Sequence, residues 1–165
     1  MKAKRVATAA SSRKAVLRAF ERALKRMFEH DIAFNRVLGL RVVSLDPQRP
    51  RVRIEMRPEL VGNFVSGQLH GGVISATLDV VAGLAIVMRR AVDKPQDTLE
   101  AQFHQNRRLG TIDLRVDYLR PGKGAWFIAS GQVVRMGARV AAVRMELEND
   151  DGELIASGSA AYMIG

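Results

Sequence analysis

The sequence has no cysteine among its 165 residues, which excludes a disulfide framework and thiolate chemistry. This absence is compatible with a reducing compartment, so we expect a cytoplasmic protein. There are three histidines, at positions 30, 70 and 104, and no HExxH pattern. Because the usual zinc ligands are scarce and scattered, we expect no metal site.

Aromatic residues are also few, with one Trp and two Tyr, while 26 Lys and Arg outnumber 17 Asp and Glu to give a net charge of +9. A basic excess favours a polyanionic partner, such as a phosphate-bearing cofactor, a nucleic acid or an anionic membrane surface. Nucleic-acid binding is disfavoured, since the basic residues are spread over many segments and few aromatic rings are present to stack on bases.

Long apolar runs are absent except for one, Val73 to Met88. Its only residues that are neither apolar nor glycine are Ser75, Thr77 and Asp79. A helix that is hydrophobic on every side is a buried helix. Sixteen residues are short for a membrane span and a carboxylate near the centre is costly there, so we expect no span.

The segments around this helix alternate in the manner of strands separated by turns. An amphipathic helix begins at about Ser12, is closed by 31–39 and precedes the strands. A polar link, 91–110, lies between the central helix and the later strands. The predicted strands are Leu40–Ser44, Arg51–Arg57, Thr111–Leu119, Ala125–Arg135, Val140–Glu148 and Leu154–Ile164. We therefore predict a basic flexible tail, 1–11, and one α+β domain, 12–165, in which an antiparallel sheet wraps around the central helix.

The buried carboxylate and the start of its helix are the candidate functional elements. An ionised Asp79 in an apolar helix is costly unless it is hydrogen-bonded for structure or used in chemistry. Upstream, His70-Gly71-Gly72 opens the helix, where free backbone amides and missing Cβ atoms allow a ligand oxygen to approach. Such amides polarise a carbonyl group as an oxyanion site does.

The spacing of these two elements has a geometric consequence. Asp79 follows His70 by nine residues, which places it on the opposite side of the helix and about 13 Å along it. One helix therefore cannot direct both groups at one substrate atom. If both serve the same site, the carboxylate comes from a second copy of the chain, most simply in a two-fold dimer with antiparallel helices.

Three stretches together resemble the hotdog-fold acyl-CoA thioesterases of the phenylacetic-acid-pathway (PaaI-like) type. They are Asn63 with Gly67-Gln68-Leu69-His70-Gly71-Gly72, then Leu78-Asp79, and then Thr111 through Gly122. The order of elements fits from about Leu38 to the end. The resemblance implies a hotdog fold, hydrolysis of acyl-CoA, a homodimer or dimer of dimers, and no cofactor beyond the substrate's own coenzyme A. Similarity around 62–72 favours medium or long fatty acyl chains.

The resemblance also implies roles for single residues. The amide of Gly71 and the side chain of Asn63 would hold the thioester carbonyl, and Asp79 of the neighbouring subunit would act as base or nucleophile. The hydroxyl of Thr111 would help to hold the water, and His70 would shape the helix entry.

The spacing from Asn63 to His70 is seven residues, where family members usually have six, so Ser66 and Gln68 remain alternatives for the role of Asn63. Leu60, Phe64 and Val65 are candidate walls for the acyl chain or members of the core.

Two basic turns are candidates for the phosphates of coenzyme A, because Arg and Lys at sheet rims form charge-assisted hydrogen bonds. Their residues are Arg120, Lys123, Arg135, Gly137 and Arg139. An alternative to catalysis is a non-catalytic acyl-CoA sensor with the same fold, in which Asp79 serves structure alone.

Overall fold

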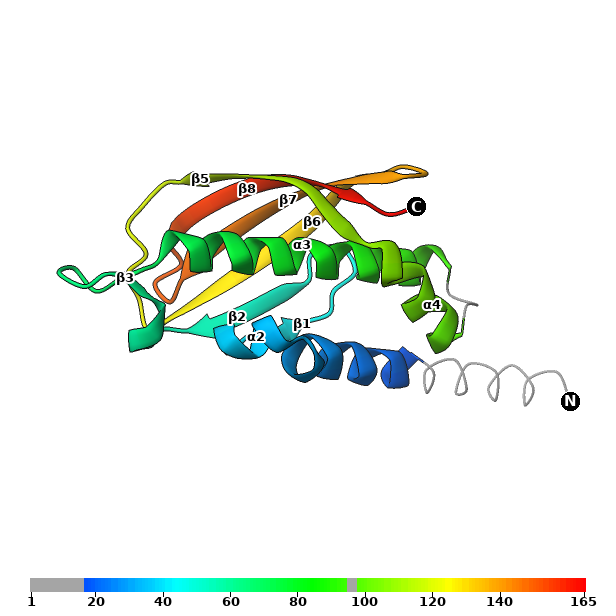
Figure 1. The fold of residues 1–165 in the computed structure, drawn as a ribbon, viewed down its shortest axis with the longest axis horizontal. Helices are drawn as coiled ribbons and strands as arrows, with labels where there is room; N and C mark the ends of the chain where they lie inside the picture. Colours follow the sequence, from blue (N-terminus) through cyan, green and yellow to red (C-terminus); the bar gives the residue numbers. More distant parts are fainter. Residues whose placement is uncertain (1–16, 95–97) are drawn as a thin grey trace, which may run out of the picture.

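The protein forms a six-stranded antiparallel sheet that curves around a long helix (Figure 1). The computed structural model describes residues 17–94 and 98–165, so the predicted tail, 1–11, lies outside the described residues. The helix is α3, Gly71–Asp93. The strands, in sheet order, are β1 (Arg41–Ser44), β2 (Arg51–Glu55), β6 (Trp126–Met136), β7 (Val140–Asn149), β8 (Leu154–Met163) and β5 (Gly110–Tyr118). The predicted architecture and strand order along the chain are confirmed.

The inner face of the sheet packs on α3 because buried apolar side chains alternate with more exposed ones along its strands. In β7, Val143, Met145 and Leu147 are buried, while Arg144 is exposed. Glycine allows the closest approach: a Cβ atom on Gly131 of β6 would lie 2.9 Å from the backbone oxygen of Val81 in α3. The core thus lies between α3 and the concave face of the sheet.

Helix α3 is longer than the predicted Val73–Met88, since it runs through Arg89 and Arg90 to Asp93. It is long and apolar enough to cross a membrane, so the argument from a short length is wrong. Its residues nevertheless pack against β6, β7, β5 and β8. Burial against the sheet accounts for one side of the helix, with Leu78 and Val81. Ala76 and Val80 are only partly buried, so the expectation of burial on every side is met in part.

The polar link predicted over 91–110 is partly helical, which corrects the prediction. Its first residues belong to α3, and α4 (Leu99–Gln105) and the 3₁₀ helix η3 (Asn106–Arg108) follow. The hydroxyl of Thr98 accepts a hydrogen bond from the Ala101 amide at 3.2 Å, as a helix N-cap does. Arg90 donates to the Gln105 carbonyl at 3.0 Å and so fastens this segment to α3.

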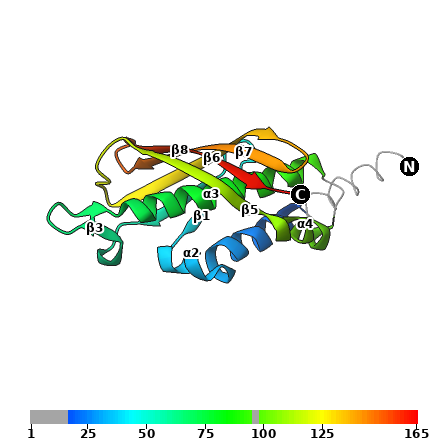
Figure 2. The ribbon, with the colours of Figure 1, turned by 45° about the horizontal axis from the view of Figure 1, so that its top comes forward.

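A small hairpin, absent from the predicted strands, precedes α3. It consists of β3 (Val61–Asn63) and β4 (Gln68–Leu69), follows the 3₁₀ helix η2 (Pro58–Leu60), and projects from one end of the molecule (Figure 2). A Cβ atom on Gly62 would lie 2.6 Å from Cα of His70. Glycine at this position therefore lets the hairpin pack directly on the start of α3.

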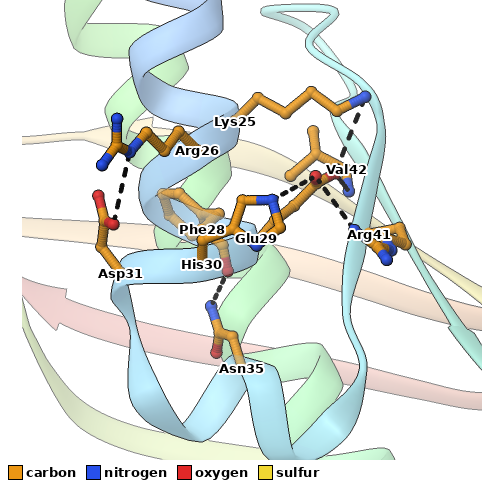
Figure 3. Close-up of polar contacts among 9 residues, drawn as sticks. All are labelled: Lys25, Arg26, Phe28, Glu29, His30, Asp31, Asn35, Arg41 and Val42. Carbon is orange, nitrogen blue, oxygen red and sulfur yellow. Dashed lines mark hydrogen bonds and ion pairs between the residues drawn. The ribbon is translucent and has the colours of Figure 1, made fainter.

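The N-terminal helix is present through residues 17–26 and continues as the π-helical turn η1, Met27–Asp31. The segment predicted only to close it contains a further helix, α2 (Ala33–Leu38). The buried carboxylate of Glu29 accepts a hydrogen bond from the Val42 amide of β1 at 2.8 Å (Figure 3). Lys25 and Arg41 lie 3.8 and 3.7 Å from that carboxylate, so it anchors the helix on the sheet.

Strand β5 forms one edge of the sheet, and β8 is its only partner among the described strands. Leu114 and Val116 pack against the core, as the alternation predicts. Ile112 departs from the pattern, because the pairing with β8 shifts between Thr111 and Asp113, and its side chain is 56% exposed. The edge therefore offers unpaired backbone groups and exposed apolar side chains.

Candidate active site

Asp79 lies in the middle of α3 and its carboxylate is held from one side. The hydroxyl of Thr111 donates to Oδ1 at 2.8 Å, and the hydroxyl of Tyr162 donates to the same oxygen at 2.6 Å. The Tyr162 hydroxyl also lies 2.9 Å from the Asp79 backbone oxygen. Among the described residues, no hydrogen bond reaches Oδ2. The second oxygen is therefore open to a water or a substrate.

Tyr162 is a site residue that sequence reasoning missed. It is 3% exposed, and burial, together with the hydrogen bond to Asp79 and its charge, raises the pKa of its hydroxyl. The hydroxyl therefore stays a neutral donor toward the carboxylate. One signal was available: a buried tyrosine requires a hydrogen-bond partner, and this chain has only two tyrosines.

The start of α3 presents the amide of Gly71. His70 is the N-cap, and its Nδ1 accepts a hydrogen bond from the Gly72 amide at 2.8 Å. The ring thus serves the helix entry. Nδ1 is occupied as an acceptor and cannot also take a proton without losing that bond. Within residues 17–94 and 98–165, no hydrogen bond takes the Gly71 amide.

The other tyrosine fixes the first turn of this helix. The hydroxyl of Tyr118 donates to the Gly71 carbonyl at 3.1 Å and lies 2.5 Å from Oγ of Ser75. Its ring lies against Gly71, where a Cβ atom would meet it at 3.4 Å. Strand β5 thus contributes Tyr118 beside Gly71 and Thr111 beside Asp79.

The hairpin holds the candidates for the second carbonyl donor. Oδ1 of Asn63 accepts from the amides of Val65 and Ser66 at 3.1 and 3.3 Å, so the side chain shapes its own turn. That arrangement leaves the Asn63 amide group, the donating end, outside these two bonds. Ser66 Oγ is buried with no hydrogen-bond partner in the described chain. Both remain candidates, as does the half-buried Gln68.

The three residues predicted to line the acyl chain differ in their exposure to solvent. Leu60 is 4% exposed and belongs to the core. Phe64 and Val65, at the hairpin tip, are 90% and 82% exposed. Only these two are available to a ligand or to another protein surface.

One protomer does not bring the two halves of the predicted site together. Gly71 and Asp79 are eight residues apart in one continuous helix, which separates them by about 12 Å along its axis. The amide at the helix start and the open Oδ2 therefore cannot reach one thioester within a single chain.

The predicted phosphate residues lie in two places. The turn with Arg120 and Lys123 precedes β6, and the turn with Arg135, Gly137 and Arg139 follows it; these ends of β6 are about 34 Å apart. Arg120 is held by Glu153 at 3.1 Å and the Leu154 carbonyl at 2.9 Å. Within one protomer a single coenzyme A cannot use both turns.

No group of three or more Asp, Glu or His suited to a metal ion occurs in the part of the chain that the structure describes. The chemistry that the residues themselves offer is a carboxylate oriented by two hydroxyls and a backbone amide at a helix start.

Comparison with known proteins identifies the family of the chain. Residues 66–156 match the family model of the thioesterase superfamily. The chain is 44% and 43% identical, over 149 residues, to proteins of Salmonella typhimurium and Escherichia coli K12, each named medium/long-chain acyl-CoA thioesterase YigI; the match covers 88% of this chain and 96% of each relative.

A crystal structure of a Shewanella oneidensis protein related to the thioesterase superfamily has the same fold. Its TM-score is 0.83 at 42% identity, over 87% of this chain and 94% of that chain. The central helix with its His-Gly-Gly entry, the oriented carboxylate and these matches lead to one conclusion: the chain belongs to the thioesterase superfamily and has its hotdog fold.

Proposed function

We propose that this protein hydrolyses medium- to long-chain fatty acyl-CoA to the free acid and coenzyme A. Relatives named for that activity are 43–44% identical and align over nearly their whole length. Membership of the thioesterase superfamily supports an enzyme and disfavours the non-catalytic sensor. The basic excess of the chain is consistent with a substrate that carries several phosphate charges.

The observation that carries the mechanism is the one-sided anchoring of Asp79. Thr111 and Tyr162 both donate to Oδ1, which fixes the side chain and leaves Oδ2 to accept a proton from an attacking water. Direct attack by Oδ2 on the thioester is the alternative that uses the same geometry. No cation within the described residues pairs with this carboxylate, so its negative charge is available for the reaction.

The carbonyl of the thioester is polarised by the Gly71 amide, with the side chain of Asn63 as the second donor and Ser66 or Gln68 as alternatives. The amide has no hydrogen bond within the described residues and lies at the start of α3, at the positive end of its dipole. These donors stabilise the oxygen as it becomes negative in the transition state.

The complete site requires a two-fold dimer in which the α3 helices run antiparallel, so that Asp79 of one copy faces Gly71 of the other. The unpaired edge of β5 supports this arrangement, because it is nine residues long and carries the exposed Ile112 and Tyr118. An edge of this kind pairs readily with an identical edge. Further pairing of dimers is compatible with this contact.

The test is the release of free thiol from a series of acyl-CoA substrates of increasing chain length, with one aromatic acyl-CoA included. We expect kcat/KM to rise from short chains to a maximum at medium or long chains. A preference for the aromatic substrate would overturn the proposed acyl specificity. Absence of thiol release from every substrate would overturn the proposed activity.

A further inference from the structure

A second polar region lies beyond the site described above, where the C-terminal end of α3 meets the turn between β6 and β7. It is a cavity of about 800 Å³. Its described lining contains four arginine or lysine side chains and one carboxylate side chain: Arg90, Lys94, Arg107, Arg108 and Asp93. The wall also contains His104, Gln105, the turn through Gly137, and Ile164 with Gly165. We call this region the basic pocket.

The charges of the basic pocket are not neutralised by one another. Its carboxylate, Asp93, is paired at 3.1 Å with Arg89. Arg90 is committed to backbone carbonyls and to Asn106. Lys94, Arg107 and Arg108 are exposed and have no ion pair with any carboxylate in the described residues.

Comparison with another basic hollow supports anion binding in the basic pocket. On the outer face of the sheet, Arg49 and Arg115 line a smaller hollow of about 350 Å³. Each of them is paired with a carboxylate: Arg49 with Glu146, and Arg115 with Asp117 at 3.2 Å. Arg144 also lines the outer hollow and has no ion pair within the described residues. That hollow therefore carries one unpaired cation, whereas the basic pocket carries three, which suit a polyanion.

The position of the basic pocket matches the reach of the substrate. Arg90 lies eleven residues beyond Asp79 in α3, or about 16 Å along the helix. The pantetheine arm has roughly thirteen bonds between its sulfur and the first phosphorus. Because three bonds of an extended chain advance about 3.4 Å, an arm of this length spans about 15 Å. The basic pocket thus lies within reach of the first phosphates of a thioester held at Asp79.

We propose that the basic pocket binds the phosphate groups of coenzyme A through Lys94, Arg107 and Arg108, a proposal that rests on the proposed acyl-CoA hydrolysis. Between the two predicted turns, the proposal selects the one at Gly137, which lines the pocket. The turn at Arg120 is disfavoured, since Glu153 already pairs with that arginine. Lys94, Arg107 and Arg108 then determine affinity for the nucleotide end and leave the chemistry at Asp79 unchanged.

The test compares two thioesters with the same acyl group, one of coenzyme A and one of pantetheine, which lacks every phosphate. In the double variant R107A/R108A we expect KM for acyl-CoA to rise about tenfold or more, with kcat within about twofold, and KM for acyl-pantetheine to stay unchanged. The control, R18A/R22A, removes the same charge from exposed positions of the N-terminal helix and should change neither KM. Equal effects of R107A/R108A on both thioesters, or none on either, would overturn the proposal.

A binding measurement separates this proposal from the proposed activity. Calorimetry with adenosine 3′,5′-bisphosphate should show binding to the wild type and to R18A/R22A, and binding weakened about tenfold or more in R107A/R108A and in K94A. Unchanged affinity in both pocket variants would contradict the phosphate site even where the enzyme hydrolyses acyl-CoA. Lack of hydrolysis with charge-dependent binding would instead contradict the proposed activity.

Discussion

Two partly or fully buried carboxylates, Glu29 and Asp79, have opposite surroundings. Glu29 accepts the Val42 amide and lies within 4 Å of the cationic side chains Lys25 and Arg41. Within the described residues, the Asp79 carboxylate accepts hydrogen bonds from two neutral hydroxyls, those of Thr111 and Tyr162, and both bond the same oxygen.

The difference indicates how this fold separates structural from reactive charge. Glu29 accepts the amide of β1 and lies close to cations of the N-terminal helix and of β1, so its contacts hold these two elements together. A carboxylate held through one oxygen by hydroxyls keeps its orientation and has a free oxygen for proton transfer. We therefore assign Glu29 to stability and Asp79 to turnover, and the following changes test that division.

The largest expected effect is that of Asp79→Asn, which retains an oxygen for the two hydroxyl donors but removes the base. We expect kcat to fall by about 10² to 10⁴, the range typical of general-base catalysis, with little change in Tm or in dimer mass. Thiol release and size-exclusion chromatography measure these quantities. Activity within tenfold of wild type would remove Asp79 from the proposed mechanism.

The next largest effect on turnover is that of Tyr162→Phe, which deletes one of the two donors to Oδ1. A hydrogen bond to a charged group contributes about 1.5–3 kcal/mol, and Thr111 still holds the carboxylate, so we expect kcat to fall about tenfold with KM unchanged. Tyr118→Phe also removes a tyrosine hydroxyl, but its effect reports on the helix entry at Gly71 and not on Asp79. A lower Tm with unchanged kcat would show that Tyr162 is structural only.

Glu29→Ala should act on stability and not on kcat. It leaves the buried Val42 amide without its acceptor, which costs about 1–3 kcal/mol. Since 1 kcal/mol corresponds to about 2–4 °C in a protein of this size, thermal unfolding should show a Tm lower by several degrees. Glu29→Gln keeps an acceptor and should lose less. A fall in kcat of the folded protein comparable with that of Asp79→Asn would contradict the division of roles.

The smallest expected effect concerns pH. Burial raises the pKa of the Tyr162 hydroxyl, so the neutral form is favoured in the folded protein. The resulting stability is fully present below the pKa of tyrosine in the unfolded chain, about 10, and is lost as the pH rises above it toward the higher folded value. The free energy of unfolding, measured in urea, should therefore fall more steeply above pH 10 in the wild type than in Tyr162→Phe. Parallel curves would contradict this.

The sequence was sufficient for the architecture because its signals are local and periodic. The alternation of β7 and the apolar run of α3 depend on neighbours two to four residues away. The strand order along the chain and the central helix followed from them. The helix in 99–105 was missed because its composition is polar, and the hairpin before α3 because its strands are only two and three residues long.

The site was predictable only in part for the same reason. Asp79 and the His70-Gly71-Gly72 entry lie within one segment, and the resemblance to known thioesterases added Thr111. Tyr162 lies 83 residues from Asp79 and meets it only through the pairing of β8 with β5 beside α3. The basic pocket combines α3, η3 and the turn at Gly137, and no single stretch of sequence contains it.

The most direct test of the central claim, that Asp79 of one subunit serves Gly71 of the other, is complementation between two inactive variants. Asp79→Asn removes the carboxylate. Gly71→Pro removes the amide at the first helical position, where proline is tolerated, and His70 already has the extended backbone that precedes proline.

If the site spans two subunits, an equal mixture of these variants refolded together contains mixed dimers with one intact site. Half of the dimers are then mixed, so thiol release should recover to about a quarter of the wild-type rate while each variant alone stays inactive. If mixed dimers form, as mass spectrometry would show, and no activity returns, both groups act within one chain and the account is contradicted.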